Sequence, residues 1–131
     1  MEINKALFKN AWPYKTDKMN LPVSDLETST SFYETIMGFQ ILYKESEPHN
    51  IVILGRDNIQ IGLSENGGDP SQEGCFFEVD NVERAFFELL SNGLKKEISE
   101  IDTEQHGETL WKVFYVVAPD GLCYCLGERQ Y

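Results

Sequence analysis

Hydrophobic positions along this chain change between two spacings, and the same order of changes occurs twice. Spacings of three and four residues, typical of one helical face, run over Leu26–Met37 and over Val82–Leu90. Apolar runs typical of strands surround each helix. In the first half they are Met19–Val23, Gln40–Lys44, Asn50–Leu54 and Ile59–Leu63, and in the second half Cys75–Val79, Ile98–Ile101, Leu110–Val117 and Leu122–Leu126.

Both predicted helices have start and stop signals of their own. Asp25 and Asn81 stand where a side-chain oxygen can accept hydrogen bonds from the first helical turn. Gly38 and Gly93 follow the last apolar positions, where glycine commonly ends a helix. The first helix is therefore expected to begin after Asp25 and to end near Met37.

The two halves match at their last strand. Residues 57–65 align with residues 120–128 without a gap, so that the predicted turn and the predicted strand of each half coincide. A cluster of turn formers, Asn66–Ser71, separates the halves. A repeated unit that cannot bury its own sheet must pair with another copy. The sequence thus predicts one α+β domain of two βαβββ modules that form a curled mixed sheet around a central cup. Its parts are an arm with one helical turn at residues 1–17, a module at 18–65, a linker at 66–73 and a module at 74–131.

Composition narrows the possible partners and the cellular location. The 131 residues are 41% hydrophobic, and no apolar run approaches the roughly 18 residues that a membrane span needs. The formal net charge of −11 would repel nucleic acid and anionic membranes, so neither is expected as a partner. That charge either serves solubility alone or marks an acidic pocket for a cationic ligand. Three cysteines without framework spacing and a start without a signal-peptide pattern favour a soluble, cytoplasmic protein.

Short motifs in both halves give the chain a family resemblance. They are Asn20–Leu26, Ser31–Glu34 and Met37–Phe39 in the first half, and Val79–Val82, Asn92–Gly93 and Ala118–Gly121 in the second. Together they resemble the glyoxalase/bleomycin-resistance/extradiol-dioxygenase superfamily, also called vicinal oxygen chelate. The segments Asn20–Pro22, Ile53–Asp57 and Gly68–Pro70 look most like the bleomycin-resistance branch. The resemblance implies a glyoxalase-like fold whose cups are commonly completed across two chains.

The resemblance also implies where a divalent metal would bind, through His and Glu side chains on the first and last strand of each module. In this chain those positions fall on Lys18, Gly62, Gly74 and Cys125. Only the thiol among them is a metal ligand, whereas a divalent site needs about three or four protein ligands. We therefore expect no metal and no cofactor. Cys123 and Cys125 share one face of a strand, where they either fill the core or form an unusual chelate.

The resemblance places Lys18 and Cys125 at ligand positions of the cup, and strand alternation counted from such positions predicts which other side chains line it. The candidate ligand-binding residues are thus Lys18, Phe76, Glu78, Trp111, Tyr115, Cys123 and Cys125. An aromatic and acidic lining suits a flat or cationic guest, although the same aromatic side chains would also serve as plain core. The two histidines, His49 and His106, are expected in polar connections, and His106 is the better candidate for a base near the cup.

Three functions remain open at this level. The first is a metal-independent protein that binds and sequesters a small drug or metabolite. The second is a lyase, an isomerase or a dioxygenase-type enzyme with a non-standard metal site, for which no catalytic residue is identified. The third is a structural or partner-binding domain, which a cup closed by side chains would indicate. A homodimer is expected, with the arm around Trp12 and Pro13 lying across the partner, because open sheet edges need covering.

Overall fold

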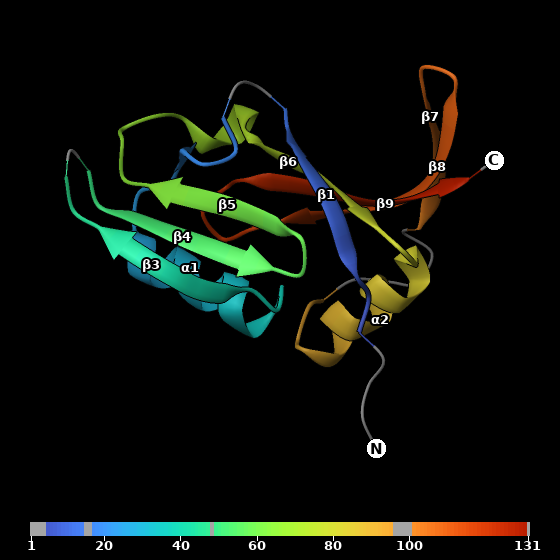
Figure 1. Cartoon of the computed structure of the whole chain (residues 1–131), viewed down its shortest axis with the longest axis horizontal. Helices are drawn as coiled ribbons and strands as arrows, with labels where there is room; N and C mark the ends of the chain where they lie inside the picture. The colour runs from blue at the N-terminus through green and yellow to red at the C-terminus, as the bar shows by residue number, and fades with distance from the viewer. Residues whose placement is uncertain (1–4, 15–16, 48, 96–100, 131) are drawn as a thin grey trace.

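The computed structural model describes residues 5–14, 17–47, 49–95 and 101–130 (Figure 1). The helices are α1 (Leu26–Thr35) and α2 (Val82–Ser91), and a short 3₁₀ helix, η1, covers Pro70–Gln72. The strands are β1 (Phe8–Pro13), β2 (Leu21–Pro22), β3 (Gln40–Glu45), β4 (Ile51–Arg56), β5 (Ile59–Ser64), β6 (Gly74–Val79), β7 (Asp102–His106), β8 (Thr109–Val117) and β9 (Cys123–Gln130).

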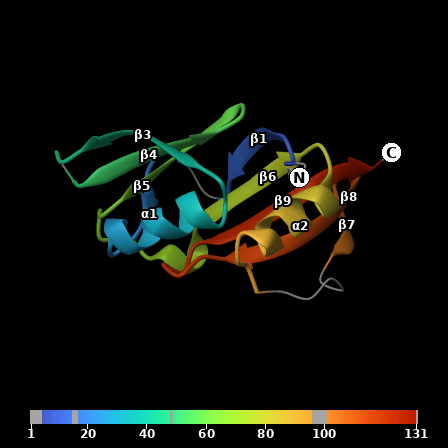
Figure 2. The same ribbon diagram turned by 90° about the horizontal axis from the view of Figure 1, so that it is seen from below.

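The strands form two sheets, and the second repeats the strand order of the first with β1 added at its edge. The first sheet runs β2-β5-β4-β3 and the second runs β1-β6-β9-β8-β7. β2 pairs in parallel with β5, as β6 does with β9, whereas the other neighbours are antiparallel. Both helices lie on the same side of the two sheets (Figure 2). The predicted α+β architecture is therefore confirmed.

Both helices begin at the predicted caps. The side chain of Asp25 accepts hydrogen bonds from two backbone N–H groups in the first turn of α1, and that of Asn81 accepts one in α2. Gly38 takes a φ of +76° where the chain turns from α1 toward β3, a conformation that favours glycine. α1 ends at Thr35, slightly before the expected Met37. Neither of these described helices is long and apolar enough to cross a membrane.

Residues 8–13 of the N-terminal arm form a strand, so within the described part of the arm the expected helical turn is wrong. β1 pairs antiparallel with β6, and Phe8 and Ala11 enter the core. The reason is the open edge of β6, whose backbone groups need hydrogen-bond partners that β1 supplies. The described part of the arm therefore pairs with the second sheet of its own chain.

The strand before β8 also differs from the prediction. Residues 98–100 of the expected strand Ile98–Ile101 lie outside the described residues, and β7 occupies Asp102–His106 instead. All five residues of β7 are polar, so no apolar alternation marks the strand, which forms because it pairs with β8 at the sheet edge. His106 was expected in a polar connection, but it is the last residue of β7.

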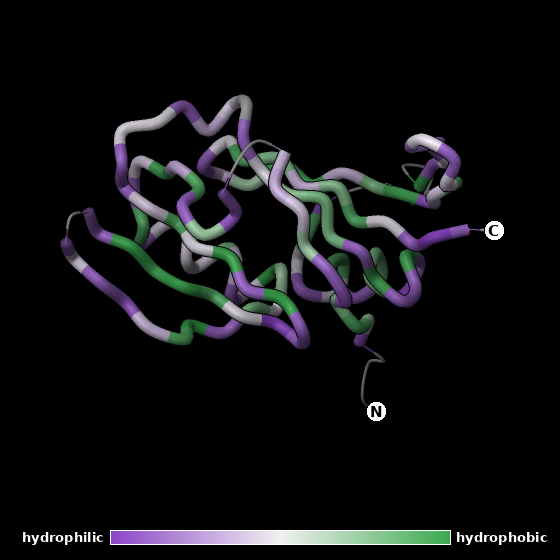
Figure 3. The backbone as a smooth tube through the Cα atoms, turned by 45° about the horizontal axis from the view of Figure 1, so that its top comes forward, coloured by the Kyte–Doolittle hydropathy of each residue, from purple (hydrophilic) through white to green (hydrophobic). Residues whose placement is uncertain are grey.

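One apolar core joins the two sheets on the side of the helices. Tyr33 of α1, Phe86 of α2, and Phe77 and Tyr124 of the second sheet are fully buried in it. The rings of Phe77 and Tyr124 stack with their centroids 5.1 Å apart. A hydrophobic stretch follows β4 and gives way to hydrophilic residues toward the β3-β4 connection (Figure 3). Because burial of this apolar surface is the main stabilising force, the core fixes how the sheets are placed and leaves their opposite faces available for other contacts.

Candidate ligand-binding site

Alternation along the second sheet divides its side chains between two faces. Phe77, Phe114 and Tyr124 point toward the helices and belong to the main core. Their neighbours in sequence point away from the helices, onto what we call the open face. The open face carries a second, separate cluster of buried side chains: Phe76, Trp111, Val113 and Cys125.

Six of the seven predicted site residues share this open face: Phe76, Glu78, Trp111, Tyr115, Cys123 and Cys125. Strand pairing brings them together, since Cys125 of β9 lies between Phe76 of β6 and Tyr115 of β8. Residues directly opposite one another on paired strands point to the same face. The sequence pattern thus grouped side chains from three strands correctly.

The open face is an aromatic surface around Phe76. The ring of Trp111 meets it edge to face with the centroids 4.8 Å apart, and the ring of Trp12 lies 5.8 Å away. The imidazole of His106 lies against the same phenyl ring at 5.6 Å. Phe76 and Trp111 are buried, whereas 43% of Trp12 is exposed. The surface therefore has a buried aromatic floor and a half-exposed aromatic rim, an arrangement that can stack a planar guest.

A carboxylate lies beside the aromatic floor. Glu78 is buried and accepts a hydrogen bond of 2.7 Å from the side-chain amide of Asn10. Two exposed cations approach it, the Nε of Arg129 at 3.7 Å and the Nζ of Lys9 at 4.0 Å. The guanidinium of Arg129 also lies over the ring of Trp111, 5.0 Å from its centroid. Positive charge thus already occupies the space between this acid and the indole.

A second polar group lies at the other side of the open face. The hydroxyl of Tyr115 lies 2.7 and 2.8 Å from the two carboxylate oxygens of Glu104 and donates its hydrogen to them. The Nε2 of His106 lies 2.9 Å from one of the same oxygens. Partial burial, followed by the hydrogen bond to Glu104, raises the pKa of Tyr115 above its usual value. Tyr115 therefore stays a neutral hydrogen-bond donor at physiological pH.

The thiol of Cys125 is not activated by this group. Burial raises the pKa of Cys125 to about 12, and the opposing effect of its hydrogen bond with Tyr115 is smaller. A thiol is nucleophilic and binds metals as its thiolate, which a pKa of this size keeps scarce at neutral pH. Cys125 is thus better suited to packing than to covalent chemistry.

The four positions where the superfamily's metal ligands would lie do not fit a divalent ion. A Cβ added to Gly62 would meet the carbonyl oxygen of Met19 at 2.2 Å, and one added to Gly74 would meet that of Cys123 at 1.7 Å. Both positions are glycine because another backbone passes too close for any side chain. Within the part of the chain that the structure describes, no group of three or more His, Cys, Asp or Glu side chains is arranged to hold a metal.

The seventh predicted residue, Lys18, is separated from the other six. Its ammonium donates to the backbone carbonyl of Ala11 in β1, with 3.3 Å between nitrogen and oxygen. Its positive charge also affects Cys75, which belongs to the main core. Burial raises the pKa of that thiol to about 12, and the charge of Lys18 lowers this pKa by a smaller amount. The position of Lys18 thus links it to β1 and to the core side of the second sheet.

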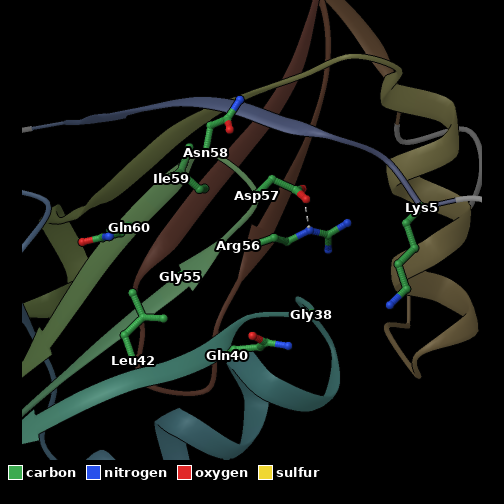
Figure 4. Close-up of a pocket in the computed structure, with 10 residues that line it drawn as sticks. All are labelled: Lys5, Gly38, Gln40, Leu42, Gly55, Arg56, Asp57, Asn58, Ile59 and Gln60. Atoms are coloured by element: carbon green, nitrogen blue, oxygen red, sulfur yellow. Dashed lines mark hydrogen bonds and ion pairs between the residues drawn. The ribbon is translucent and has the colours of Figure 1, made fainter.

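Two surface clefts among the described residues lie away from the predicted site residues. One cleft of about 450 Å³ lies at the turn between β4 and β5, with Arg56 and Asp57 on one side and Lys5 of the arm on the other (Figure 4). Another, of about 910 Å³, lies between α1 and the β3-β4 hairpin. Neither of these two clefts includes a residue of the open face.

Sequence reasoning missed several residues of the open face. Trp12 was missed because its arm was expected to be helical, and Glu104 because β7 has no apolar pattern. Arg129 lies two residues beyond Gly127 on β9, so it continues the alternation of Cys123 and Cys125. Extending the predicted strand to Gln130 would have placed Arg129 on the same face as those cysteines.

The fold and the open face are those of a small α+β protein built from repeated helix-and-sheet units, and comparison with protein families names the class. A model described as the Glyoxalase/Bleomycin resistance protein/Dioxygenase superfamily matches residues 15–121. The chain therefore belongs to this superfamily. No curated protein matches the chain.

Several solved structures share the fold. A bleomycin resistance determinant encoded on transposon Tn5 is 22% identical, with a TM-score of 0.65, and the match covers 89% of this chain and 99% of that one. An antibiotic binding protein from a Streptomyces species is 18% identical, with a TM-score of 0.59 and coverages of 88% and 97%. A lactoylglutathione lyase from Agrobacterium tumefaciens is 15% identical, with a TM-score of 0.61 and coverages of 87% and 92%. At these identities the similarity concerns the fold alone.

Proposed function

We propose that this chain binds a small, flat organic molecule on the open face, without a metal, and thereby sequesters it. The observation that carries the proposal is the aromatic floor of Phe76 and Trp111 beside the buried carboxylate of Glu78. Stacking on buried rings supplies affinity, and a carboxylate in a region of low dielectric supplies selectivity. Two of the similar structures, a bleomycin resistance determinant and an antibiotic binding protein, have names that fit this function.

The preferred guests are cationic or neutral planar molecules. Glu78 and Glu104 both lie on the open face, and the whole chain carries a net charge of −11. A cation over an aromatic ring is attracted by the ring's quadrupole, and it gains a carboxylate partner here. Anions such as phosphonates and glutathione conjugates would meet the like charge of these two acids.

The side chains that cover the open face are movable. Trp12 and Tyr115 are each close to half exposed, and the side chain of Arg129 is 54% exposed. Half-exposed side chains exchange rotamers quickly, so a guest can displace them without unfolding a strand. This supports binding over the purely structural reading, in which the covering groups would be held as tightly as the core.

A homodimer would complete the site. Large apolar side chains remain exposed on both sheets: Trp12, Tyr115 and Val117 on the second, and Leu42 and Tyr43 on the first. Patches of this kind commonly mark association surfaces. We propose that two chains bring these faces together, and light scattering at micromolar concentration should then give the mass of two chains. A monomer under those conditions would contradict the pairing.

The enzymatic alternative lacks support from the residues at the superfamily's metal positions. Lys18 presents an ammonium, and Gly62 and Gly74 have no room for a side chain. A lyase or dioxygenase in this chain would need ligands from elsewhere. Elemental analysis of gently purified protein tests this point: one tightly bound zinc, nickel, iron or manganese per chain would favour the enzyme.

A thermal-shift panel tests the binding proposal. Planar aromatic cations, neutral planar molecules and acidic metabolites are added to the full chain. A ligand at a hundred times its Kd stabilises the fold by about 2.7 kcal/mol, which shifts the Tm by several degrees. The cationic and neutral classes should give this shift, Trp12→Ser should weaken it, and Phe87→Ser, which removes an exposed aromatic from α2, should leave it unchanged.

Two results of the panel would contradict the account. If no class of compound shifts the Tm, the proposed binding function is contradicted. A shift with acidic metabolites alone would instead overturn the preference for cations, and Lys18 would become the first residue to substitute.

A further inference from the structure

The guanidinium of Arg129 fills a small site that the chain builds on its open face. One wall is the ring of Trp111, with the guanidinium carbon 5.0 Å from its centroid. The other is the carboxylate of Glu78, whose Oε2 lies 3.7 Å from the Nε of Arg129. The two walls are fixed, because Glu78 and Trp111 are each only 6% exposed. The side chain of Arg129 is 54% exposed, so the occupant is the mobile component.

The register of the sheet explains why this site exists. Arg129 pairs with Trp111 across β8 and β9, and Gly127, two residues earlier, pairs with Glu78 across β6 and β9. Gly127 has no side chain, and a Cβ there would meet the ring of Phe76 at 2.6 Å. Nothing from β9 therefore stands between the carboxylate and the indole except the side chain of Arg129 itself.

A planar cation placed on an indole and next to a carboxylate receives both attractions that recognise such a group. Arg129 is such a planar cation and belongs to the chain itself. Its ion pair with Glu78 is weak, because the guanidinium is open to water. Its tether gives it an effective concentration of roughly millimolar, which a ligand must overcome to take its place.

We propose that Arg129 is an internal stand-in for the ligand, and that the site takes a planar organic cation such as an aromatic amidinium or guanidinium. The ligand replaces Arg129 over Trp111 and pairs with Glu78, while Arg129 swings into solvent. The inference rests on the proposed function, since it specifies the ligand class of the same face. Arg129 is thus a specificity-determining residue that competes with the ligand.

The competing structural view is that Arg129 only covers Trp111 and stabilises the sheet. Both views predict some loss of stability in Arg129→Ala. They differ in affinity, because only a competitor for the ligand's place makes binding tighter when it is removed.

The test uses benzamidine, a planar aromatic cation, and benzamide, its neutral isostere. Both are titrated into the full chain by ¹H–¹⁵N NMR, which also reports whether each variant is folded. Arg129→Ala should lower the Kd for benzamidine by about tenfold, since a tethered competitor is gone. The Kd for benzamide should change less than about twofold, because an uncharged guest gains little from Glu78. Adding Glu78→Gln to Arg129→Ala should abolish the gain for benzamidine.

Lys9→Ala is the matched control, because it removes another positive charge near Glu78 without uncovering the indole. It should change the Kd for benzamidine much less than Arg129→Ala does. An equal gain in Lys9→Ala, or an equal gain for benzamide in Arg129→Ala, would overturn the stand-in role. If benzamide binds the open face and benzamidine gains nothing in Arg129→Ala, this inference fails while the proposed function stands. If neither compound perturbs the open face of any variant, both fail.

Discussion

The guanidinium of Arg56 and the carboxylate of Glu88 form a two-point ion pair inside the chain, with nitrogen-to-oxygen distances of 2.7 and 2.6 Å. Both side chains are buried. Ala6 of the arm closes the group, because its carbonyl accepts from Arg56 and its N–H donates to Glu88. One polar group thus ties the arm, the end of β4 and α2 together.

Substitution of Glu88 by Ala should destabilise the fold strongly. The change removes the two-point partner of the buried Arg56 and leaves it only the longer ion pair of 3.4 Å between its Nε and Asp57, which costs about 3 kcal/mol of unfolding free energy. Urea denaturation followed by circular dichroism measures this loss. The matched control is Glu83→Ala, which breaks an ion pair of 2.6 Å with Lys112 at the surface and should leave the urea midpoint nearly unchanged. Equal effects of the two substitutions would contradict a structural role for the buried pair.

Gly62→Ala should destabilise the first sheet. The new methyl group would lie 2.2 Å from the backbone oxygen of Met19, so the backbone itself must shift, at a cost of about 1–3 kcal/mol. Gly55→Ala is the control in the neighbouring strand, where the nearest atom is the flexible end of Leu42 at 2.8 Å. Urea midpoints of the two variants should differ clearly, with Gly62→Ala the lower. The reverse order would contradict the close contact between the backbone of Met19 and Gly62 of β5.

The three cysteines should differ in reactivity in the folded protein. Burial raises the pKa values of Cys75 and Cys125 to about 12, whereas Cys123 is partly exposed. At pH 8 a thiol of that pKa holds about a thousandfold less thiolate than an ordinary cysteine. Ellman's reagent should therefore label one thiol quickly and the other two slowly, and mass spectrometry should place the fast label on Cys123. Rapid labelling of Cys125 in the native state would contradict its burial among Phe76, Trp111 and Val113.

Asp120 should make folding stability depend on pH. Burial raises its pKa in the folded chain above the ordinary value, and the hydrogen bonds it accepts from Leu122 and Tyr33 oppose this less strongly. The folded state then binds the proton more readily than the unfolded state, so the wild type loses stability as pH rises from about 4 through the raised pKa. Asp120→Asn lacks this loss, and its stability relative to the wild type should improve over that interval. Urea denaturation at several pH values checks the sign, and a relative stability that falls with pH would refute it.

The parts of the fold that are encoded locally could be predicted from the sequence. Asp25 and Asn81 act within one helical turn of themselves, so each cap could be recognised without knowing the fold. β1 could not, because its partner β6 lies more than sixty residues away in the sequence and the segment ends at Pro13. β7 is an edge strand of polar residues, which pairing with β8 defines and hydrophobicity does not.

The candidate site divides in the same way. Period-two alternation is a local property, so Phe76 and Glu78 could be placed on one face of their strand before any fold was known, and the superfamily's expected ligand positions joined them with Cys125 of another strand. Lys18 was grouped with them through an expected position in the superfamily, and tertiary contacts instead direct its ammonium to Ala11. Trp12 reaches the face only because β1 joins the sheet there.

The central claim, that the open face binds a flat organic molecule, is tested most directly by ¹⁹F NMR of the full chain labelled with 5-fluorotryptophan. The chain has two tryptophans, Trp12 and Trp111, and both lie on the open face with their rings 6.4 Å apart. The labelled protein is titrated with the compound that gives the largest thermal shift. The account predicts that both resonances move along one saturation curve with the Kd measured by the thermal shift. Binding that leaves both resonances in place would contradict it, because the ligand would then lie elsewhere on the molecule.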